Sequence, residues 1–86
     1  MVASLKDTVN LMLSEEYGDR LRAEYYQTKI RLGRLEHTIR MLERGLLDFE
    51  PACPLRIMYT QMYQAKMYLA ILETRAIIED IKLNTD

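Results

Sequence analysis

The sequence contains one cysteine, one histidine and no tryptophan among its 86 residues. Because Cys53 is alone, one chain forms neither an internal disulfide nor a cysteine-based zinc site. His37 stands in no Glu-x-x-His or His-Glu-x-x-His pattern, which excludes helical di-iron and zincin sites. We therefore expect no catalytic residue, no metal site and no cofactor, and we expect that the protein is not an enzyme.

Long apolar runs and strand signals are also missing. No apolar run approaches the roughly 20 residues of a membrane span, and the first residues do not resemble a signal peptide. Only two prolines and three glycines occur, clean alternation over four residues is absent, and no Asn-Gly or Asp-Gly turn is found. These absences predict an all-α protein in the cytoplasm, with no membrane partner.

The hydrophobic content is 49%. That is more apolar surface than a two-layer helical unit of this size easily buries, which favours a homo-oligomer. Turn and cap residues divide the chain: Ser4 with Asp7, Ser14, and Gly45 followed by two prolines. We expect a single helical domain, 1–86, with a short helix over 4–13, a long helix over 15–44, a turn over 45–54 and a second long helix over 55–83.

Both long helices carry apolar residues at heptad spacing. In the first, this seam comprises Leu21, Tyr25, Thr28, Leu32, Leu35, Ile39, Leu42 and Leu46. In the second, it comprises Leu55, Met58, Met62, Ala65, Leu69, Leu72 and Ala76. Seams joined by a ten-residue turn predict an antiparallel helical hairpin. The second helix is apolar around most of its circumference, so we expect the short N-terminal helix and a second subunit to cover the rest in a helical bundle.

Positive charge is concentrated on the first long helix. The net charge is −1, yet residues 20–44 carry Lys29 and six arginines against three glutamates, a balance of +4. Two interpretations stay open: a solvated helix face with ion pairs such as Glu36–Arg40, or a surface that binds a small phosphorylated ligand with tyrosines stacking on its bases. The candidate ligand-binding residues are Arg20, Tyr26, Arg31, Arg34 and His37.

Gly33 lies inside this helix, where glycine costs roughly 1 kcal/mol relative to alanine. Close approach by another helix, a notch for a ligand, and a solvated position without a role are all compatible with it.

The second helix is rich in methionine and tyrosine over 58–72. Core packing explains some of these residues, and an adaptable interface with another subunit or partner explains the surplus. The candidate interface residues are Met58, Tyr59, Met62, Tyr63, Met67, Ile71 and Ile78.

Over about residues 12–80 the chain resembles a family of small helical-hairpin proteins of tailed phages and prophages. That family has the patterns "LS-x-x-Y/E…R…E-Y-x-x-L-x-x-K-x-x-x-L" and "M-x-x-Y-L-x-x-L-x-x-R". The matching residues are Leu13, Ser14, Tyr17, Arg20, Glu24, Tyr25, Leu35, Tyr68, Leu69, Leu72 and Arg75. Gly18 and Gly33 stand where the pattern has helix formers.

The resemblance implies a non-enzymatic phage or prophage accessory protein in the host bacterial cytoplasm. Small proteins of this kind resemble inhibitors of bacterial defence, which block a host defence protein or sequester a nucleotide signal. The residues also allow a passive helical oligomerisation module. A nucleic-acid-binding regulator is disfavoured by the net acidity and by the absence of a recognition-helix pattern.

Overall fold

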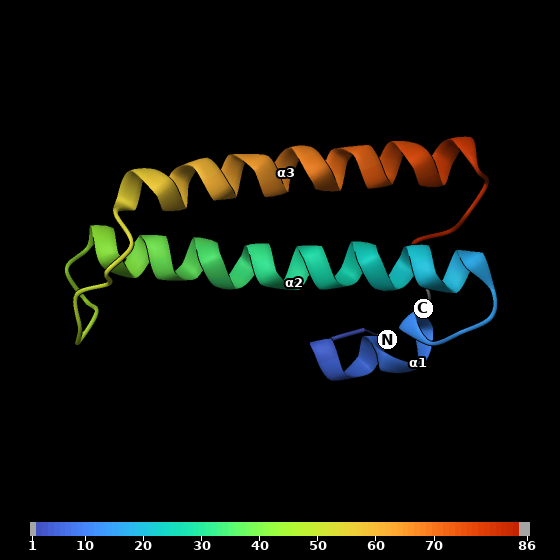
Figure 1. Cartoon of the computed structure of the whole chain (residues 1–86), viewed down its shortest axis with the longest axis horizontal. Helices are drawn as coiled ribbons and strands as arrows, with labels where there is room; N and C mark the ends of the chain where they lie inside the picture. Colours follow the sequence, from blue (N-terminus) through green and yellow to red (C-terminus); the bar gives the residue numbers. More distant parts are fainter. Residues whose placement is uncertain (1, 85–86) are drawn as a thin grey trace.

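The structure is a computed structural model that describes residues 2–84, and every regular element in this range is helical (Figure 1). The elements are a 3-10 helix η1 (Leu5–Thr8), α1 (Val9–Met12), α2 (Tyr17–Glu43) and α3 (Leu55–Ile78). Helices α2 and α3 run side by side in opposite directions, joined at one end by residues 44–54. The predicted all-α antiparallel hairpin with a short N-terminal helix is therefore confirmed. None of the described helices is long and apolar enough to cross a membrane.

The hairpin core consists of residues from the two predicted seams. Leu21 and Leu72 are the most deeply buried, with 2% and 0% of their surface exposed. The other buried members are Leu32 and Ile39 of α2 and Ala76 of α3. Because these residues are spaced by four, seven and eleven positions, they line one side of each helix and meet where the two helices pack.

The N-terminal segment packs on α2, on the side away from α3 (Figure 1). Ala23 lies buried there, and the Gln27 side-chain amide donates to the buried Thr8 hydroxyl at 2.9 Å. Within residues 2–84 neither η1 nor α1 contacts α3. The expectation that the short helix covers α3 was therefore wrong: the small Ala23 side chain lets it approach α2 instead.

The starts of the first helical segment and of α2 were predicted to within two residues. Ser4 and Asp7 form the expected capping box, in which the Ser4 backbone N–H donates to the Asp7 carboxylate at 3.0 Å. Helix α2 starts at Tyr17 rather than at residue 15, and Ser14 is not its N-cap. Instead the Ser14 hydroxyl accepts from the Glu16 backbone N–H and donates to Asp19, which fixes the turn before the helix.

The two long helices end in the same way. After α2, Gly45 has φ +67° and the Leu46 N–H donates to the Met41 carbonyl at 2.9 Å. After α3, Asp80 has φ +55° and the Ile81 N–H donates to the Ala76 carbonyl at 2.8 Å. Each is a Schellman ending, with one residue in the left-handed conformation.

Helix α3 therefore ends at Ile78, and the predicted helix to residue 83 was too long. The residues after it turn back onto the core, where Ile81 and Leu83 pack against the cluster of Leu21, Leu72 and Ala76. Backbone carbonyls hold this tail to α2: Arg22 donates to Lys82 O at 2.5 Å, and the Tyr26 hydroxyl donates to Leu83 O at 2.7 Å. Burial of two apolar side chains compensates for the helical turns that are not formed.

Candidate functional site

The C-terminal half of α2 carries exposed positive side chains, on the side away from α3 and on the two flanks of that side. We call this cluster the α2 basic face; its members are Arg31, Arg34, His37, Arg40 and Arg44. All five are exposed, and within residues 2–84 their side chains form no hydrogen bond or ion pair. The stretch from Arg31 to Arg44 spans roughly 20 Å of helix, so neighbouring members of this face, such as Arg34 and His37, are close enough to act together on one ligand.

The two carboxylates of this stretch are turned toward α3. Glu36 lies 3.6 Å from the Lys66 ammonium, and Glu43 accepts a short hydrogen bond from the Tyr59 hydroxyl. The expected Glu36–Arg40 ion pair is not formed, because the antiparallel packing brings Lys66 to Glu36. The bond to Glu43 raises the pKa of Tyr59, since the neutral hydroxyl donates to the carboxylate. The outward side of α2 thus has no carboxylate to neutralise its arginines between residues 31 and 44.

Three of the five candidate ligand residues, Arg31, Arg34 and His37, belong to the α2 basic face. The other two have structural partners. Arg20 donates to the Ser14 carbonyl at 2.8 Å. Tyr26 is half-buried, holds the C-terminal tail through Leu83, and meets Tyr25 edge to face with ring centroids 5.2 Å apart. The structure therefore brings together three of the five predicted residues. The role of these three as ligand residues stays a prediction.

Arg40 and Arg44 were absent from the predicted group. The sequence places Glu36 four residues before Arg40, an arrangement that usually indicates an ion pair. The competing partner, Lys66, comes from another helix and cannot be identified from the spacing within α2. Near the helix C-terminus both arginines are also favoured by the negative end of the helix dipole.

Gly33 is exposed within this region, and a Cβ built on it would meet nothing within 4 Å. None of the other described helices approaches it, so close packing within residues 2–84 is excluded as its reason. The glycine leaves a gap in the helix surface next to His37, which is one turn further along α2.

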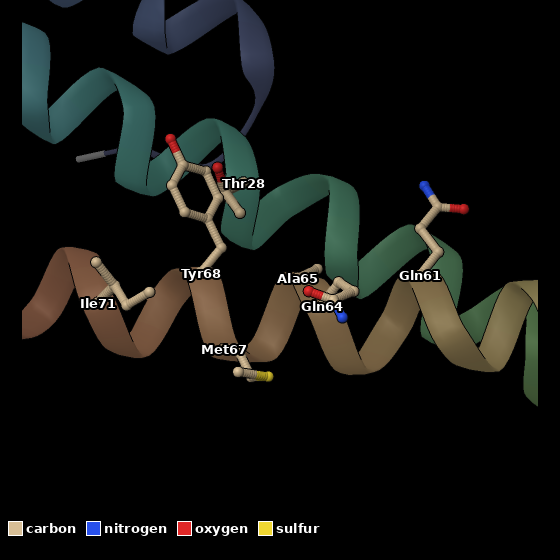
Figure 2. Close-up of a pocket in the computed structure, with 7 residues that line it drawn as sticks. All are labelled: Thr28, Gln61, Gln64, Ala65, Met67, Tyr68 and Ile71. Atoms are coloured by element: carbon tan, nitrogen blue, oxygen red, sulfur yellow. The ribbon is translucent and has the colours of Figure 1, made fainter.

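The candidate interface residues fall on two sides of α3. Met58 and Met62 are half-buried and share a side with Leu72, toward α2. Tyr59 is also half-buried through its bond to Glu43. The remaining four, Tyr63, Met67, Ile71 and Ile78, are exposed. Figure 2 shows Met67 directed away from α2, whereas the Tyr68 ring leans toward Thr28 of α2. Their function as an interface stays a prediction.

A polar cluster closes the opposite end of the hairpin. Arg75 donates to the Tyr17 hydroxyl in a short hydrogen bond and to Glu79 at 3.2 Å, which joins the start of α2 to the end of α3. Hydrogen bonding to Tyr17, with a further contribution from Arg75, lowers the pKa of Glu79. The same contact with Glu79 raises the pKa of Tyr17. Since each group here has a partner, we assign this cluster to stability.

Metal ligands do not gather in the described part of the chain: no three His, Cys, Asp or Glu side chains lie close enough to hold an ion. The arginines of the α2 basic face offer electrostatic binding. Guanidinium groups bind phosphate oxygens with two parallel hydrogen bonds, and exposed arginines are free to reorient toward such a ligand.

Comparison with known proteins identifies one relationship. The family profile described as Sequestin matches residues 15–78. The match runs from just before α2 to the last residue of α3 and so covers the hairpin, the α2 basic face and the exposed side of α3. No curated protein and no solved structure matches the chain.

Proposed function

The chain belongs to the Sequestin family, and on this premise we propose that it acts by binding and sequestering a small phosphorylated ligand, a nucleotide signal. The family name is compatible with a binding or sequestering role. The α2 basic face supplies the structural support for the finer statement about the ligand.

One observation carries the proposal: five exposed positive or titratable side chains lie between Arg31 and Arg44, and the two carboxylates of this stretch contact Lys66 and Tyr59 of α3 instead of these side chains. An isolated arginine on a protein surface is common, but surface cations are usually interspersed with anions. Here Lys66 and Tyr59 engage the nearby Glu36 and Glu43 on the other side of the helix. The positive potential of the outer side is thereby left for a ligand with at least two negative charges.

The proposed action is binding without chemistry. His37 has no carboxylate or nucleophile as a partner in the described residues, and a general base needs an orienting group within hydrogen-bond reach. We therefore propose that the ligand leaves unchanged when the protein is unfolded.

The biological setting that we propose is antagonism of a bacterial immune component by a phage or prophage protein. Small phage hairpins of the kind that the sequence resembles support this setting. Removing a nucleotide signal requires only tight, stoichiometric binding, a task suited to a protein of 86 residues. Direct blocking of a host defence protein is the competing route to the same outcome.

Titration calorimetry against a panel of cyclic and linear nucleotides tests the proposal. We expect binding of at least one phosphorylated compound that weakens as salt is raised, because the contacts are exposed ion pairs. Heating the complex and analysing the supernatant should return the nucleotide intact. A degraded nucleotide would contradict the non-enzymatic part of the proposal.

Substitutions of arginine test whether the α2 basic face is the binding site. Arg31→Ala together with Arg34→Ala should weaken binding roughly tenfold or more, as expected for the loss of charge-assisted hydrogen bonds. Arg56→Ala is the matched control, since Arg56 is an exposed arginine on α3 without a side-chain partner among the described residues. Equal loss in both variants would indicate non-specific attraction. Absence of binding across the panel would refute nucleotide sequestration and favour the blocking of a host protein.

A further inference from the structure

The side of α3 that faces away from α2 carries a second series of residues at heptad spacing. We call this series the outer α3 seam; its members are Thr60, Gln64, Met67, Ile71, Thr74 and Ile78. All six are exposed, and within residues 2–84 no element of the chain covers them. Their spacing of 4-3-4-3-4 repeats the pattern of the buried seam on the opposite side of the same helix.

Half of the seam residues, Met67, Ile71 and Ile78, have large apolar side chains. Tyr63, which flanks the seam, is 59% exposed, and Met67, Ile71 and Ile78 are 61%, 53% and 77% exposed. None of the seam residues is charged, although 29% of the chain is. An uncharged row with several large, exposed apolar side chains on the surface of a small protein indicates a binding surface.

The surface also has hollows into which side chains of another helix can pack. An open hollow of about 470 Å³ lies beside the seam, at its boundary with α2, and is lined by Thr28 of α2 and by Gln61, Gln64, Ala65, Met67, Tyr68 and Ile71 of α3 (Figure 2). Among these, Gln64, Met67, Tyr68 and Ile71 have the i, i+3, i+4, i+7 relationship. A smaller hollow of about 240 Å³ follows one turn later, lined by Ala70, Ile71, Thr74 and Arg75. In a coiled coil each projecting side chain enters such a four-residue space on the facing helix.

The geometry points to a second copy of this chain as the occupant, with the two α3 helices packed antiparallel about a two-fold axis between Met67 and Ile71. The seam has the same spacing when it is read in either direction. A two-fold interface between antiparallel helices requires this symmetry, because the seam of one subunit meets the same seam of the partner running in the opposite direction. Thr60 then meets Ile78 of the partner subunit, Gln64 meets Thr74 of the partner subunit, and Met67 meets Ile71 of the partner subunit.

The side chains of the seam favour a second copy of this chain over the phosphorylated ligand proposed for the α2 basic face. The seam offers no cation to a phosphate, and Arg75 beside the second hollow is already bonded to Tyr17 and Glu79. Self-pairing places no like charges opposite each other along the seam, and antiparallel helices align their dipoles favourably. Gln64 and Thr74 of the partner subunit can hydrogen-bond at the interface.

The area of the seam approaches the lower end of the range for specific interfaces. Tyr63, Met67, Ile71 and Ile78 each expose roughly 100 Å², on the scale of 150–250 Å² for a whole large side chain, so eight such side chains remove roughly 800 Å² from water. The threonines, Gln64 and Ala70 bring the total toward the roughly 1,200 Å² at the lower end of specific interfaces.

Sedimentation of the full chain without ligand tests the inference independently of nucleotide binding. We expect a mass of at least twice the 10.2 kDa of one chain. Ile71→Glu should at least halve that mass, because a buried unpaired carboxylate weakens association roughly a hundredfold or more. Helix content by circular dichroism should not change, since Ile71 lies outside the hairpin core. A wild-type mass of one chain, or an unchanged mass for Ile71→Glu, would overturn the inference.

Phe49→Glu is the matched control, because Phe49 is 60% exposed but lies in the connection between the helices. It should leave the mass unchanged; an equal loss would indicate general hydrophobic association rather than the seam.

Disulfide crosslinking of introduced cysteines, in a Cys53→Ser background, tests whether the two α3 helices run antiparallel. Thr60→Cys alone should not crosslink, because antiparallel packing places the two positions roughly 27 Å apart. Thr60→Cys with Ile78→Cys should crosslink efficiently between subunits. Crosslinking of Thr60→Cys alone would show a parallel pair and refute the two-fold arrangement.

Discussion

Replacement of Gly33 by alanine should stabilise the protein. The position is in the interior of α2, where glycine is less favourable than alanine by about 0.8–1.0 kcal/mol. The added methyl group meets no atom within 4 Å, so no steric cost offsets this gain. We expect the free energy of unfolding to rise by about 1 kcal/mol and the melting temperature by about 4–8 °C for a domain of this size.

Chemical denaturation at a fixed protein concentration measures the effect, since association would otherwise change the midpoint. Gly45→Ala is the contrasting variant: Gly45 has φ +67°, and alanine in that conformation should lower the stability by about 1–2 kcal/mol. A higher free energy of unfolding for Gly33→Ala and a lower one for Gly45→Ala would show that backbone conformation and open space decide the effect of the substitution.

A neutral or destabilising Gly33→Ala would refute this reasoning, because it would mean that another surface approaches Gly33 closely. Nucleotide titration of the same variant then separates the alternatives for the glycine. A stabilised variant with unchanged affinity means that Gly33 has no role in binding. A stabilised variant with weakened affinity means that the ligand occupies the gap beside His37.

Three further outcomes follow from the packing and the hydrogen bonds. Leu72→Ala should lower the free energy of unfolding by about 2–5 kcal/mol, because Leu72 is completely buried; a loss below about 1 kcal/mol in denaturant titration would contradict its place in the core. The backbone N–H groups of Ala3 and Ser4 lower the pKa of Asp7 below 3.8, so its contribution to stability is present above that pH and disappears as the pH falls through the lowered value. An NMR titration should show the Ser4 amide signal moving only in strongly acidic solution, and a transition at or above pH 3.8 would be inconsistent with the capping box. Tyr26→Phe should speed amide exchange in residues 79–84 with a loss of only about 0.5–1.5 kcal/mol; unaltered exchange in that tail would argue against the bond to Leu83.

The hairpin was predictable because its information is local and repetitive. Heptad spacing identified Leu21, Leu32 and Ile39 on α2, and Leu72 on α3, as the side chains that meet in the core. Gly45 likewise marked the end of α2 through its own conformational preference. Such signals need no knowledge of distant parts of the chain.

The features that were missed depend on contacts between distant residues. The end of α3 uses Asp80 in the left-handed conformation, which is rare for residues other than glycine and is stabilised by packing of Ile81 on the core. Likewise, the partner of Glu36 is Lys66, thirty residues away, so the arginines of α2 could not be sorted into paired and unpaired groups. Tyr26 looked available for a ligand because its partner, Leu83, belongs to the tail.

The attachment of the N-terminal segment and of the tail after α3 to neighbouring residues of α2 bears on how the described part of the chain resists a mechanical load. Gln27 holds Thr8 of the N-terminal segment, while Tyr26 holds Leu83 of the tail. A force applied between the ends of the described chain therefore reaches these few hydrogen bonds first. Once they break, the force acts at the open end of the hairpin and separates α2 from α3 one turn at a time. We expect the hairpin to open from this end, at lower force than a structure sheared along its whole seam.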